Sequence, residues 1–248
     1  MQDPIDIFSS VPGDPGLVSC LCVTEERPAF LPWLFWNYRK QDYQARELVI
    51  VDSSRETPAT DDPSVSIVRC RPRTNVAAKR NLAVEAARGT LITWFDDDDW
   101  QHPRKLSILA AALGEDGVLA GPRQSWFVDV YRDRARPHDA QRNVIFNGLG
   151  VRRAALDGVR FDEQRARAAD TAWVAAVRRQ TRCSARVVSQ VLSCWLCHGA
   201  NISNPVKRYV FRQPLSDVAH AVGAADWGET GQELARLRTR LKGATADR

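Results

Sequence analysis

Asp96 to Asp99 are four consecutive aspartates that lie between the aromatic residues Phe95 and Trp100. Neighbouring carboxylates about 6 Å apart repel each other by roughly 0.7 kcal/mol in water and by about 3 kcal/mol at an effective dielectric constant of about 20. In a cleft, such a cluster either raises the pKa values of its carboxyl groups or binds a cation. Oxygen ligands suit a hard divalent cation, Mn²⁺ or Mg²⁺, which completes its coordination shell with water and substrate phosphates. The sequence therefore predicts a site for a divalent metal and phosphate groups at this turn.

An acidic loop at the start of a helix is the alternative interpretation of the four aspartates, because helix N-termini favour negative charge. The next helix is expected to begin at Pro103, which is beyond the reach of Asp96 and Asp97. The cation-binding interpretation is therefore favoured.

The segments before the aspartates are expected to alternate between strands and helices. Apolar runs predict strands at residues 17–24, 47–51, 65–70 and 91–95, with helices at residues 28–41 and 75–88. Continuous apolar strands that alternate with helices are typical of parallel βαβ units, in which helices cover both faces of the sheet. Ligands bind beyond the carboxyl ends of such strands, so residues 24–27, 52–54 and 96–99 should meet at one rim.

After the aspartates the alternation loosens. The expected elements are a helix at residues 103–113, a strand at 117–120, a mobile hairpin or flap at 125–142, a helix at 165–179 and a strand at 186–197. Leu234, Leu237 and Leu241 recur at helical spacing among basic residues, which favours a surface helix packed by its leucines over a membrane-contact helix. We expect an N-terminal arm at residues 1–16, an α/β domain at 17–205 and a helical tail at 206–248.

The composition is that of an ordinary globular protein of 248 residues, with 44% hydrophobic and 26% charged residues. The net charge of +5 is spread along the chain, so no nucleic-acid partner is expected, and a weak attraction to anionic lipid stays open. The sequence contains no apolar run of membrane-spanning length, and its N-terminus lacks the features of a signal peptide. We therefore expect a cytoplasmic protein.

Cys194 to His198 spells the C-x-x-C-H pattern of c-type haem attachment, and C-x-x-C also occurs in redox and zinc sites. The apolar, β-branched residues before this motif predict a strand, in which residues three apart point to opposite faces. Cys194 and Cys197 are therefore expected to share neither a metal ion nor a disulfide.

The segment from Asn75 to Trp100, NVAAKRNLAVEAARGTLITWFDDDDW, resembles the family 2 glycosyltransferases of the GT-A fold. The family pattern runs from a Gly through Ala-Arg-Asn, a helix, a second Gly and a hydrophobic strand to Leu-Asp-x-Asp-Asp-Trp. Residues 18–54 resemble the first βαβ unit of the same family, and the whole match covers roughly residues 17–205. The resemblance implies an α/β fold with a mixed, mostly parallel sheet and helices on both faces.

The resemblance also assigns residues to the nucleotide of a nucleoside-diphosphate sugar. Thr24, Glu25 and Arg27 would line the base and ribose, and Asp52, at the end of the second strand, would bind the edge of the base. The usual second acid or Gly after this aspartate is missing, which leaves the identity of the base open.

The aspartate run receives separate roles in the same comparison with the family. Asp96 and Asp97 would lie near the ribose and diphosphate, and Asp98 takes the position of the main metal-binding aspartate. His198 follows the last expected strand, where many members carry a histidine near the diphosphate. It is a further metal ligand, a donor to the leaving group or a structural histidine.

Two residues near the nucleotide depart from the family pattern, although Arg80 and Asn81 match its Arg-Asn pair. Asn75 replaces the usual Gly, and we expect the turn to survive because Asn tolerates positive φ better than other residues with a Cβ. Lys79 replaces the usual Ala, and it either contacts phosphate or is an exposed helix lysine.

The general base of an inverting transfer takes the proton of the acceptor hydroxyl, and the family uses the aspartate of a Glu-Asp pair at a helix start. Asp170 occupies that position, with Ala169 in place of the Glu, and an ordinary surface aspartate is the alternative. Trp173 is either a core residue or a residue that stacks on the acceptor. Asn147 and Gly148 resemble the segment that contacts donor sugar or acceptor.

The implied activity is an inverting, metal-dependent transfer of a sugar from a nucleoside-diphosphate sugar, most simply a UDP-sugar, to a hydroxyl of a small molecule or glycan precursor. A nucleotidyltransferase would also use carboxylates and a metal, but it would usually add a Gly-rich loop after the first strand, and residues 23–28 (VTEERP) contain no glycine. A nucleotide-sugar-binding module without catalysis is the third interpretation, and it is disfavoured because the four aspartates and Asp170 are all present.

Overall fold

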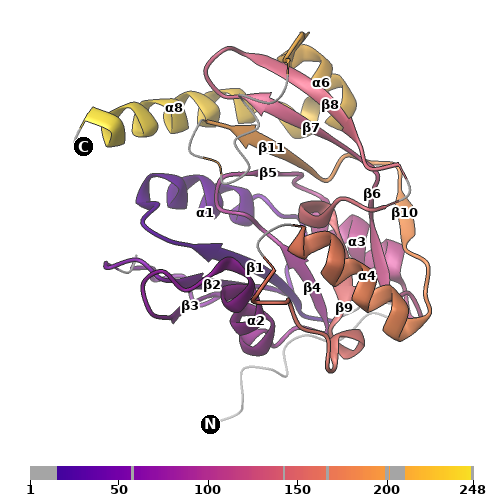
Figure 1. Ribbon diagram of the computed structural model, residues 1–248. Helices are drawn as coiled ribbons and strands as arrows, with labels where there is room; N and C mark the ends of the chain where they lie inside the picture. Colours follow the sequence, from indigo (N-terminus) through magenta and orange to yellow (C-terminus); the bar gives the residue numbers. More distant parts are fainter. Residues whose placement is uncertain are drawn as a thin grey trace.

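Two β-sheets organise the chain (Figure 1). The computed structural model describes residues 16–56, 59–141, 143–165, 168–198, 201 and 210–246. The strands are β1 (Val18–Thr24), β2 (Arg46–Asp52), β3 (Val65–Arg69), β4 (Leu91–Trp94), β5 (Trp100–Gln101), β6 (Leu119–Pro122), β7 (Gln124–Asp129), β8 (Arg134–Asp139), β9 (Gly150–Arg152), β10 (Arg186–Val188), β11 (Ser193–Cys197) and β12 (Gln213–Pro214). Within the described residues, one sheet has seven strands in the order β10-β6-β9-β4-β1-β2-β3, and the other has five in the order β12-β8-β7-β11-β5.

The helices lie between these strands and at the C-terminal end. They are α1 (Leu31–Arg39), α2 (Val76–Ala86), α3 (Lys105–Leu113), α4 (Ala169–Thr181), α6 (Leu215–Val222), α7 (Ala224–Trp227) and α8 (Thr230–Ala246), with short 3-10 helices η2 (Pro28–Phe30), η3 (Phe146–Gly148) and η4 (Arg153–Leu156). The first four strands and the helices α1 and α2 lie at the segments that the apolar pattern predicts.

The seven-stranded sheet is mixed and mostly parallel. Strand β1 pairs in parallel with β2 and β4, β2 pairs in parallel with β3, and β10 pairs in parallel with β6. Strand β9 is antiparallel to both β4 and β6. The predicted α/β fold with a mostly parallel sheet is therefore confirmed.

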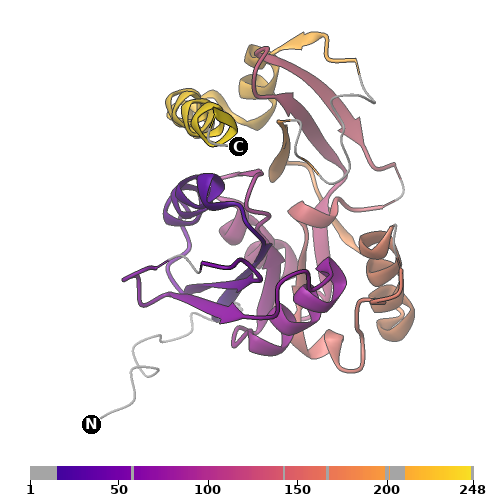
Figure 2. The ribbon, with the colours of Figure 1, turned by 60° about the vertical axis from the view of Figure 1, so that its left-hand side comes forward.

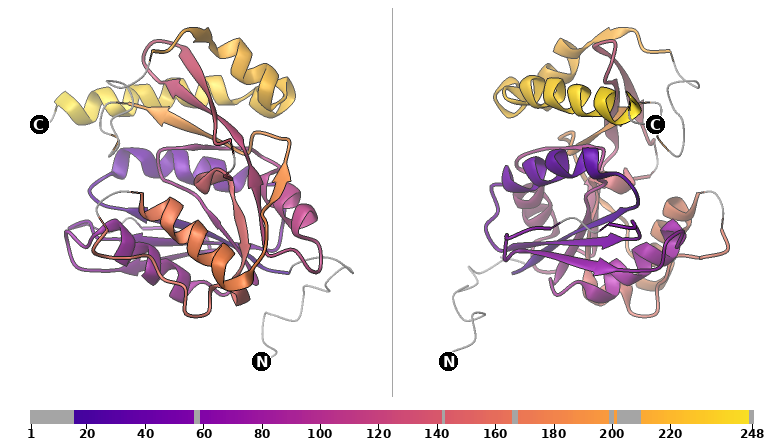
Figure 3. Two further views of the ribbon diagram at one scale, coloured as in Figure 1. Left: turned by 45° about the vertical axis from the view of Figure 1, so that its right-hand side comes forward. Right: turned by 90° about the vertical axis from the view of Figure 1, so that its left-hand side faces the viewer.

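Helices cover both faces of this sheet because its strands are apolar on both sides. In β1, Leu21 packs in the cluster that includes residues of α2 and α4, whereas Cys20 and Cys22 pack with residues of α1 and α3. Figure 3 shows α4 against the sheet and below the second sheet. Loops follow the carboxyl ends of β1, β2 and β4 at residues 25–27, 53–56 and 95–99, and they lie at one rim because these strands are parallel.

The second sheet forms its own core with the C-terminal helices. Val128 and Leu196 pack with Leu234, Leu237 and Leu241 of α8, and all five side chains are buried. Figure 2 shows α8 lying beside α1, next to this sheet. The prediction of a helix packed by its leucines is confirmed. Across the described ranges, no helix has the length and apolar character that a membrane span needs.

The prediction of one strand at residues 186–197 is wrong. This segment forms two strands, of which β10 joins the seven-stranded sheet and β11 joins the second sheet between β7 and β5. Ser189 and Gln190 are exposed where the chain crosses from one sheet to the other. The apolar residues on both sides of this crossing look like a single strand in the sequence, although Val188 and Leu192 pack in the core of the first sheet and Val191 and Cys194 pack in the core of the second.

The predicted hairpin is formed by β7 and β8, which pair antiparallel. Strand β7 also pairs with β11, and β8 also pairs with β12, so the hairpin belongs to the interior of the second sheet and is not a free flap. Residue 142, the arm at residues 1–15 and the expected boundary at residues 205–206 lie outside the described residues.

The C-x-x-C segment lies in β11, as the pattern predicts. Cys194 and Cys197 are buried and free, and burial raises the pKa of both thiols. Within the part of the chain that the structure describes, no three His, Cys, Asp or Glu side chains are grouped as a metal site would need.

Candidate active site

The acidic turn follows β4 and lies beside the end of β1. The Thr24 hydroxyl donates a hydrogen bond to Asp97 Oδ2 at 2.6 Å. Arg27 Nη1 lies 2.8 Å from Asp97 Oδ1, and Arg27 Nη2 pairs with Asp98 Oδ2. Because β1 and β4 are parallel neighbours, their carboxyl ends bring these four side chains together. They were all predicted to lie at this rim.

His198 reaches the same turn from the end of β11, in the second sheet. Its Nε2 lies 3.0 Å from Asp98 Oδ2, and the Asn201 amide donates to the same oxygen at 3.4 Å. The imidazole packs against Phe30, with 4.5 Å between the ring centroids. His198 Nδ1 is buried and has no hydrogen-bond partner among the described residues. The structure thus places His198 with Asp98, and Asn201 is a neighbour that sequence reasoning missed.

The first three aspartates differ in pKa. Burial and the charge of Asp98 raise the pKa of Asp97 to about 7, and burial raises that of Asp96 to about 6. Burial also acts to raise the pKa of Asp98, but the hydrogen bond with His198 and the charge of Arg27 outweigh burial and lower it. Asp98 is therefore the carboxylate that keeps its negative charge to the lowest pH.

Asp99 points away from its three neighbours and holds the turn in place. Its Oδ2 accepts a hydrogen bond from Asn147 Nδ2 at 2.6 Å, and its Oδ1 accepts one from the Leu196 amide at 3.2 Å. Its backbone oxygen accepts from the Trp33 indole at 2.9 Å. Burial, together with the charges of the neighbouring aspartates, raises the pKa of Asp99 well above its usual value.

Asn147 and Gly148 are packing residues below this turn, which corrects their expected place at the sugar or acceptor. Asn147 is 1% exposed, and its Oδ1 accepts a hydrogen bond from Ser193 at 2.8 Å. A Cβ on Gly148 would lie 2.7 Å from Pro122 Cγ, so this position needs glycine for close packing. The Asn147 side chain is thus taken up by Asp99 and Ser193, and Gly148 is buried.

Lys105, in the first turn of α3, lies below the acidic turn and was missed by sequence reasoning. Its Nζ donates to the backbone oxygens of Trp94 at 2.6 Å and Asn147 at 2.7 Å, and to Gln101 Oε1 at 2.8 Å. Burial lowers the pKa of this fully enclosed amine to about 7. The only signal in the sequence is a lysine at the start of the apolar helix KLSILAAAL.

Lys79 lies between the ends of β1 and β2 and is not an exposed helix lysine. It is 3% exposed, because its Nζ donates to the Thr24 backbone oxygen at 3.2 Å, to Ser53 Oγ at 3.0 Å and to Glu25 Oε2 at 3.2 Å. Burial acts to raise the pKa of Glu25, but hydrogen bonds from the Arg73 amide and Lys79 outweigh it and lower the pKa. Lys79 thereby links the ends of β1 and β2.

Asp52 ends β2 and leaves one carboxylate oxygen unused. Its Oδ1 accepts hydrogen bonds from the Ser54 amide at 2.9 Å and the Ser54 hydroxyl at 2.6 Å. Its Oδ2 is buried and has no hydrogen-bond partner among the described residues. A buried acceptor of this kind favours a ligand that supplies an N–H donor.

Asn75 does not adopt positive φ, which corrects the sequence interpretation of this position. Its φ is −66°, and its side chain accepts a hydrogen bond from the Ala78 amide at 2.8 Å as the N-cap of α2. The left-handed residue of this loop is Arg73, with φ 63°. Asn75 therefore positions the start of α2, and its own side chain is occupied by the cap.

Arg80 and Asp170 form an ion pair between α2 and α4. The Arg80 guanidinium also lies over the rings of Phe146 and Phe161, at 4.6 and 5.4 Å from their centroids. The Asp170 side chain is 41% exposed, and its Oδ2 makes no hydrogen bond within the described residues. Asp170 thus keeps one carboxylate oxygen unpaired, and it lies near enough to Asp96 for its charge to act to raise the pKa of that carboxyl group.

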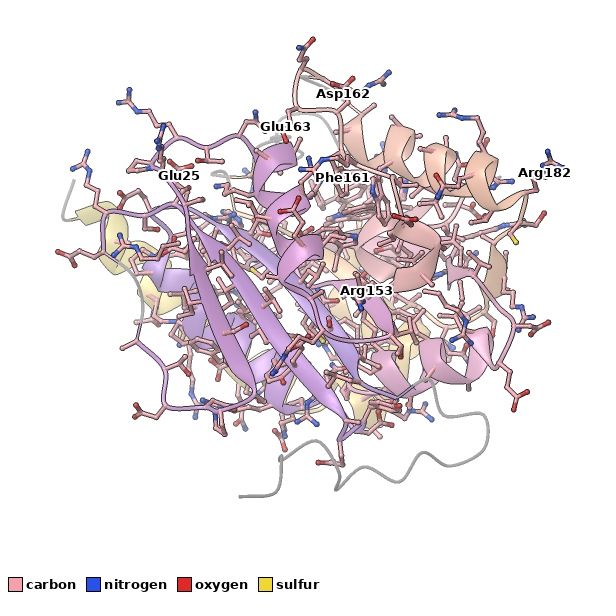
Figure 4. All side chains as sticks on the ribbon, turned by 90° about the horizontal axis from the view of Figure 1, so that it is seen from below. Glu25, Arg153, Phe161, Asp162, Glu163 and Arg182 are labelled. Carbon is pink, nitrogen blue, oxygen red and sulfur yellow. The ribbon has the colours of Figure 1, made fainter. Side chains whose placement is uncertain are left out.

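Trp173 lies in the core and not at an open surface, which decides between its two expected roles. It is 2% exposed and stacks on Phe161 at 4.8 Å between centroids. In Figure 4, Phe161 lies between α2 and α4, and Glu163 lies at the end of α2. Asn81 donates to both the Phe161 backbone oxygen and Glu163 Oε1, at 3.1 and 2.9 Å. Phe161, which stacks on Trp173, in turn packs against the Arg80 guanidinium.

The family is decided by the match of residues 20–168 to the family described as Glycosyl transferase family 2. The chain belongs to this family. The chain is 32% identical over 80 residues to a protein of Escherichia coli K12 named as the colanic acid biosynthesis glycosyl transferase WcaA. That match covers 29% of this chain and 29% of the length of the E. coli protein.

Two solved structures are similar to the chain in fold. The mannosyltransferase PcManGT of Pyrobaculum calidifontis, in complex with GDP-Man and Mn²⁺, has a TM-score of 0.59 and 16% identity, covering 99% of this chain and 79% of that one. S. aureus TarS 1-349, in complex with UDP-GlcNAc, has a TM-score of 0.60 and 16% identity, covering 78% and 61%. The predicted GT-A fold is confirmed.

Proposed function

We propose that this transferase moves a sugar from a nucleoside-diphosphate sugar to an acceptor hydroxyl, with inversion at the anomeric carbon and with a bound divalent metal. The observation that carries this proposal is the meeting of Arg27, Asp97, Asp98 and His198 at one point, from the ends of β1, β4 and β11. A diphosphate and its metal need cationic side chains for the phosphates and carboxylates for the metal, and this rim supplies both.

The donor atoms at the turn fit Mn²⁺ or Mg²⁺. Asp98 Oδ2 and His198 Nε2 supply an oxygen and an imidazole nitrogen 3.0 Å apart, of which the carboxylate oxygen suits Mn²⁺ and Mg²⁺ and the imidazole suits a transition metal. Such ions are commonly held by one or two protein ligands, with water and substrate phosphates as the others. When bound, the cation would offset the negative charge of the departing diphosphate. Arg27 contacts the same Asp98 oxygen, so metal binding and this ion pair should compete.

The nucleotide base is proposed to bind beside Asp52, whose buried Oδ2 is a free acceptor. A ring N–H of uracil or guanine would satisfy this oxygen. UDP is our first choice of nucleotide, and GDP is the alternative, because the similar structures are complexes with UDP-GlcNAc and with GDP-Man. Thr24, Glu25 and Lys79 would line the adjoining ribose and phosphate.

Asp170 is proposed as the general base. Its Oδ2 would accept the proton of the acceptor hydroxyl while that oxygen bonds to the anomeric carbon and the bond to the diphosphate breaks. The Arg80 ion pair on Oδ1 would hold the carboxylate in orientation. The transfer is a single displacement, so no covalent bond to the enzyme forms.

A nucleotidyltransferase is less well supported, because the β1 end presents Glu25 and Arg27 side chains and no glycine. A binding module without catalysis is less well supported, because the chain has all four aspartates of the turn together with a partly exposed carboxylate at Asp170.

The experiment that tests the proposal is a thermal-shift titration with UDP, GDP and other nucleoside diphosphates, with Mn²⁺ and with EDTA. We expect one nucleotide to stabilise the protein only with the metal, by about 2.7 kcal/mol at a concentration of 100 Kd. Asp98→Ala should abolish this effect, and Asp61→Ala, a change at an exposed aspartate, should retain it. Equal stabilisation of the Asp98→Ala protein would contradict the metal assignment.

A further inference from the structure

The second sheet presents an aromatic face to α4. Trp195 is opposite Phe127 in the strand register, and their rings stack with 4.7 Å between centroids. The neighbouring residues Cys194 and Leu196 point to the opposite face and pack in the core with α8, because successive residues of a strand alternate. His138, on β8, lies edge-on to Trp195 at 5.2 Å. Trp195, Phe127 and His138 are called the aromatic ledge below.

A cavity of about 380 Å³ lies between this ledge and α4. Trp195 and His138 line it from the sheet, Phe146 lines it from η3, and Asp170, Val174 and Arg178 line it from one face of α4. Its volume lies within the range of about 300–1,000 Å³ that small-molecule sites occupy. Asp170, the proposed base, therefore both pairs with Arg80 and lines this cavity.

Two polar side chains that line the cavity have no hydrogen-bond or ion-pair partner among the described residues. Within the described residues, the Arg178 guanidinium makes no ion pair or hydrogen bond, and the same holds for the hydroxyl of Thr171, which also lines the cavity. Asp170 is already paired with Arg80. Arg178 is thus an unpaired cation at a wall of the cavity, where a ligand anion would meet it.

The spacing on α4 relates the cation to the base. Asp170 and Arg178 are eight residues apart on one helix face, which corresponds to about 12 Å along the helix axis. Long side chains on a helix lean toward its N-terminus, so the Arg178 guanidinium lies closer to Asp170 than the helix rise alone gives. A ligand with its hydroxyl at Asp170 would therefore need its anionic group about one sugar-ring width away from that hydroxyl. An aromatic surface suits the C–H face of such a ring, and the hydroxyl of Thr171 suits its hydroxyl groups.

We propose that this cavity is the acceptor site and that the acceptor is a sugar that carries an anionic group, a carboxylate or a phosphate, held by Arg178. This inference rests on the proposed function, since it takes Asp170 as the base. The sugar ring would lie on the aromatic ledge with its reacting hydroxyl at Asp170 Oδ2. Arg178 would then select acceptors by charge, and the nucleotide site would not be affected.

Calorimetric titration with matched monosaccharides tests the proposal. Methyl β-glucuronide and glucose 6-phosphate represent the two anions, and methyl β-glucoside is the neutral match. We expect at least one anionic sugar to bind about tenfold or more tightly than the glucoside, because a charged pair with arginine is lost in the neutral sugar. The sugar that binds identifies the anion as a carboxylate or a phosphate.

Arg178→Gln should remove this preference, and Arg178→Lys should retain part of it. Arg179→Gln is the control, because Arg179 has the same charge on the same helix, is exposed and does not line the cavity. Equal binding of charged and neutral sugars, or equal losses in the Arg178→Gln and Arg179→Gln proteins, would overturn the inference. Tight binding of a neutral phenol in place of any sugar would also overturn it.

Each titration is repeated with and without the nucleotide and Mn²⁺, so that the two proposals fail separately. If the nucleotide and Mn²⁺ fail to stabilise the unmodified protein, the proposed function is contradicted, and the sugar titration stands as an independent result. Intact nucleotide stabilisation, together with no charge preference, would contradict the acceptor inference alone.

Discussion

The four aspartates of the acidic turn are identical in type but differ in their surroundings. Asp97 and Asp98 face Arg27, Asp98 also meets His198, and Asp99 is held by Asn147 and a backbone amide. These contacts, rather than the residue type, set the charge of each carboxyl group. A run of equal side chains therefore yields one carboxylate whose pKa is lowered, Asp98, and three whose pKa is raised, of which Asp99 also holds the turn.

The stability of the protein should depend on pH through Asp97. Its pKa is about 7 in the folded protein against an ordinary 3.8, so the folded state binds more protons in between and the free energy of unfolding falls as pH rises. Asp97→Asn should reduce this fall. Urea unfolding of both proteins without metal, at about pH 5 and about pH 7.5, measures it. The same pH dependence in both proteins would contradict the assignment.

Asp170→Asn should remove transfer and leave nucleotide binding intact, because the amide cannot accept the proton but can keep the shape of the side chain. We expect a loss of about 100-fold or more in the release of nucleoside diphosphate from the donor. Asp162→Asn, at an exposed aspartate nearby, is the control. Turnover that persists in the Asp170→Asn protein would assign the base to another residue.

At the scale of elements, the site depends on how helices and strands end. Helix α2 carries Lys79 to one side of the rim and Arg80 to the other, and its start is set by the Asn75 cap. Strand β11 carries His198 to Asp98 from the second sheet. Local signals in the sequence identify where these elements begin, but the partner of each side chain depends on which elements become neighbours.

The cap of α2 should contribute measurably to stability. Asn75→Ala removes the acceptor for the Ala78 amide and should lower the free energy of unfolding by about 1 kcal/mol. Asn75→Asp keeps the acceptor and should cost less. Urea unfolding curves compare the two variants. Equal losses would show that the hydrogen bond from Asn75 Nδ2 to the Glu163 backbone oxygen, and not the cap, carries the stability.

At the scale of the whole molecule, the C-terminal helix is part of the structure that holds the site. Leu234, Leu237 and Leu241 share a core with Trp100, which directly follows the acidic turn. The Trp100 indole also donates a hydrogen bond to the Thr230 hydroxyl at 3.1 Å. The second sheet, its helices and the acidic turn are therefore packed as one body.

Leu237→Ala should destabilise the protein by about 2–5 kcal/mol, because this side chain is fully buried between α8 and the second sheet. Gln232→Ala, at an exposed position of the same helix, should change stability by less than about 0.5 kcal/mol. Urea unfolding measures both. A small effect of Leu237→Ala would contradict the place of α8 in this core.

The sequence by itself determined the βαβ order, the acidic turn and the family, because apolar runs, caps and the aspartate motif are local patterns. It also predicted that Thr24, Arg27, Asp97 and Asp98 would meet, since parallel strands end at one rim. Only the tertiary structure decided that Lys79 is buried, that Asn147 supports Asp99 and that Trp173 is in the core. The sequence also could not predict the second sheet or the cavity beside α4. Contacts between distant segments depend on which segments pack together in each core, and a local sequence pattern does not contain that information.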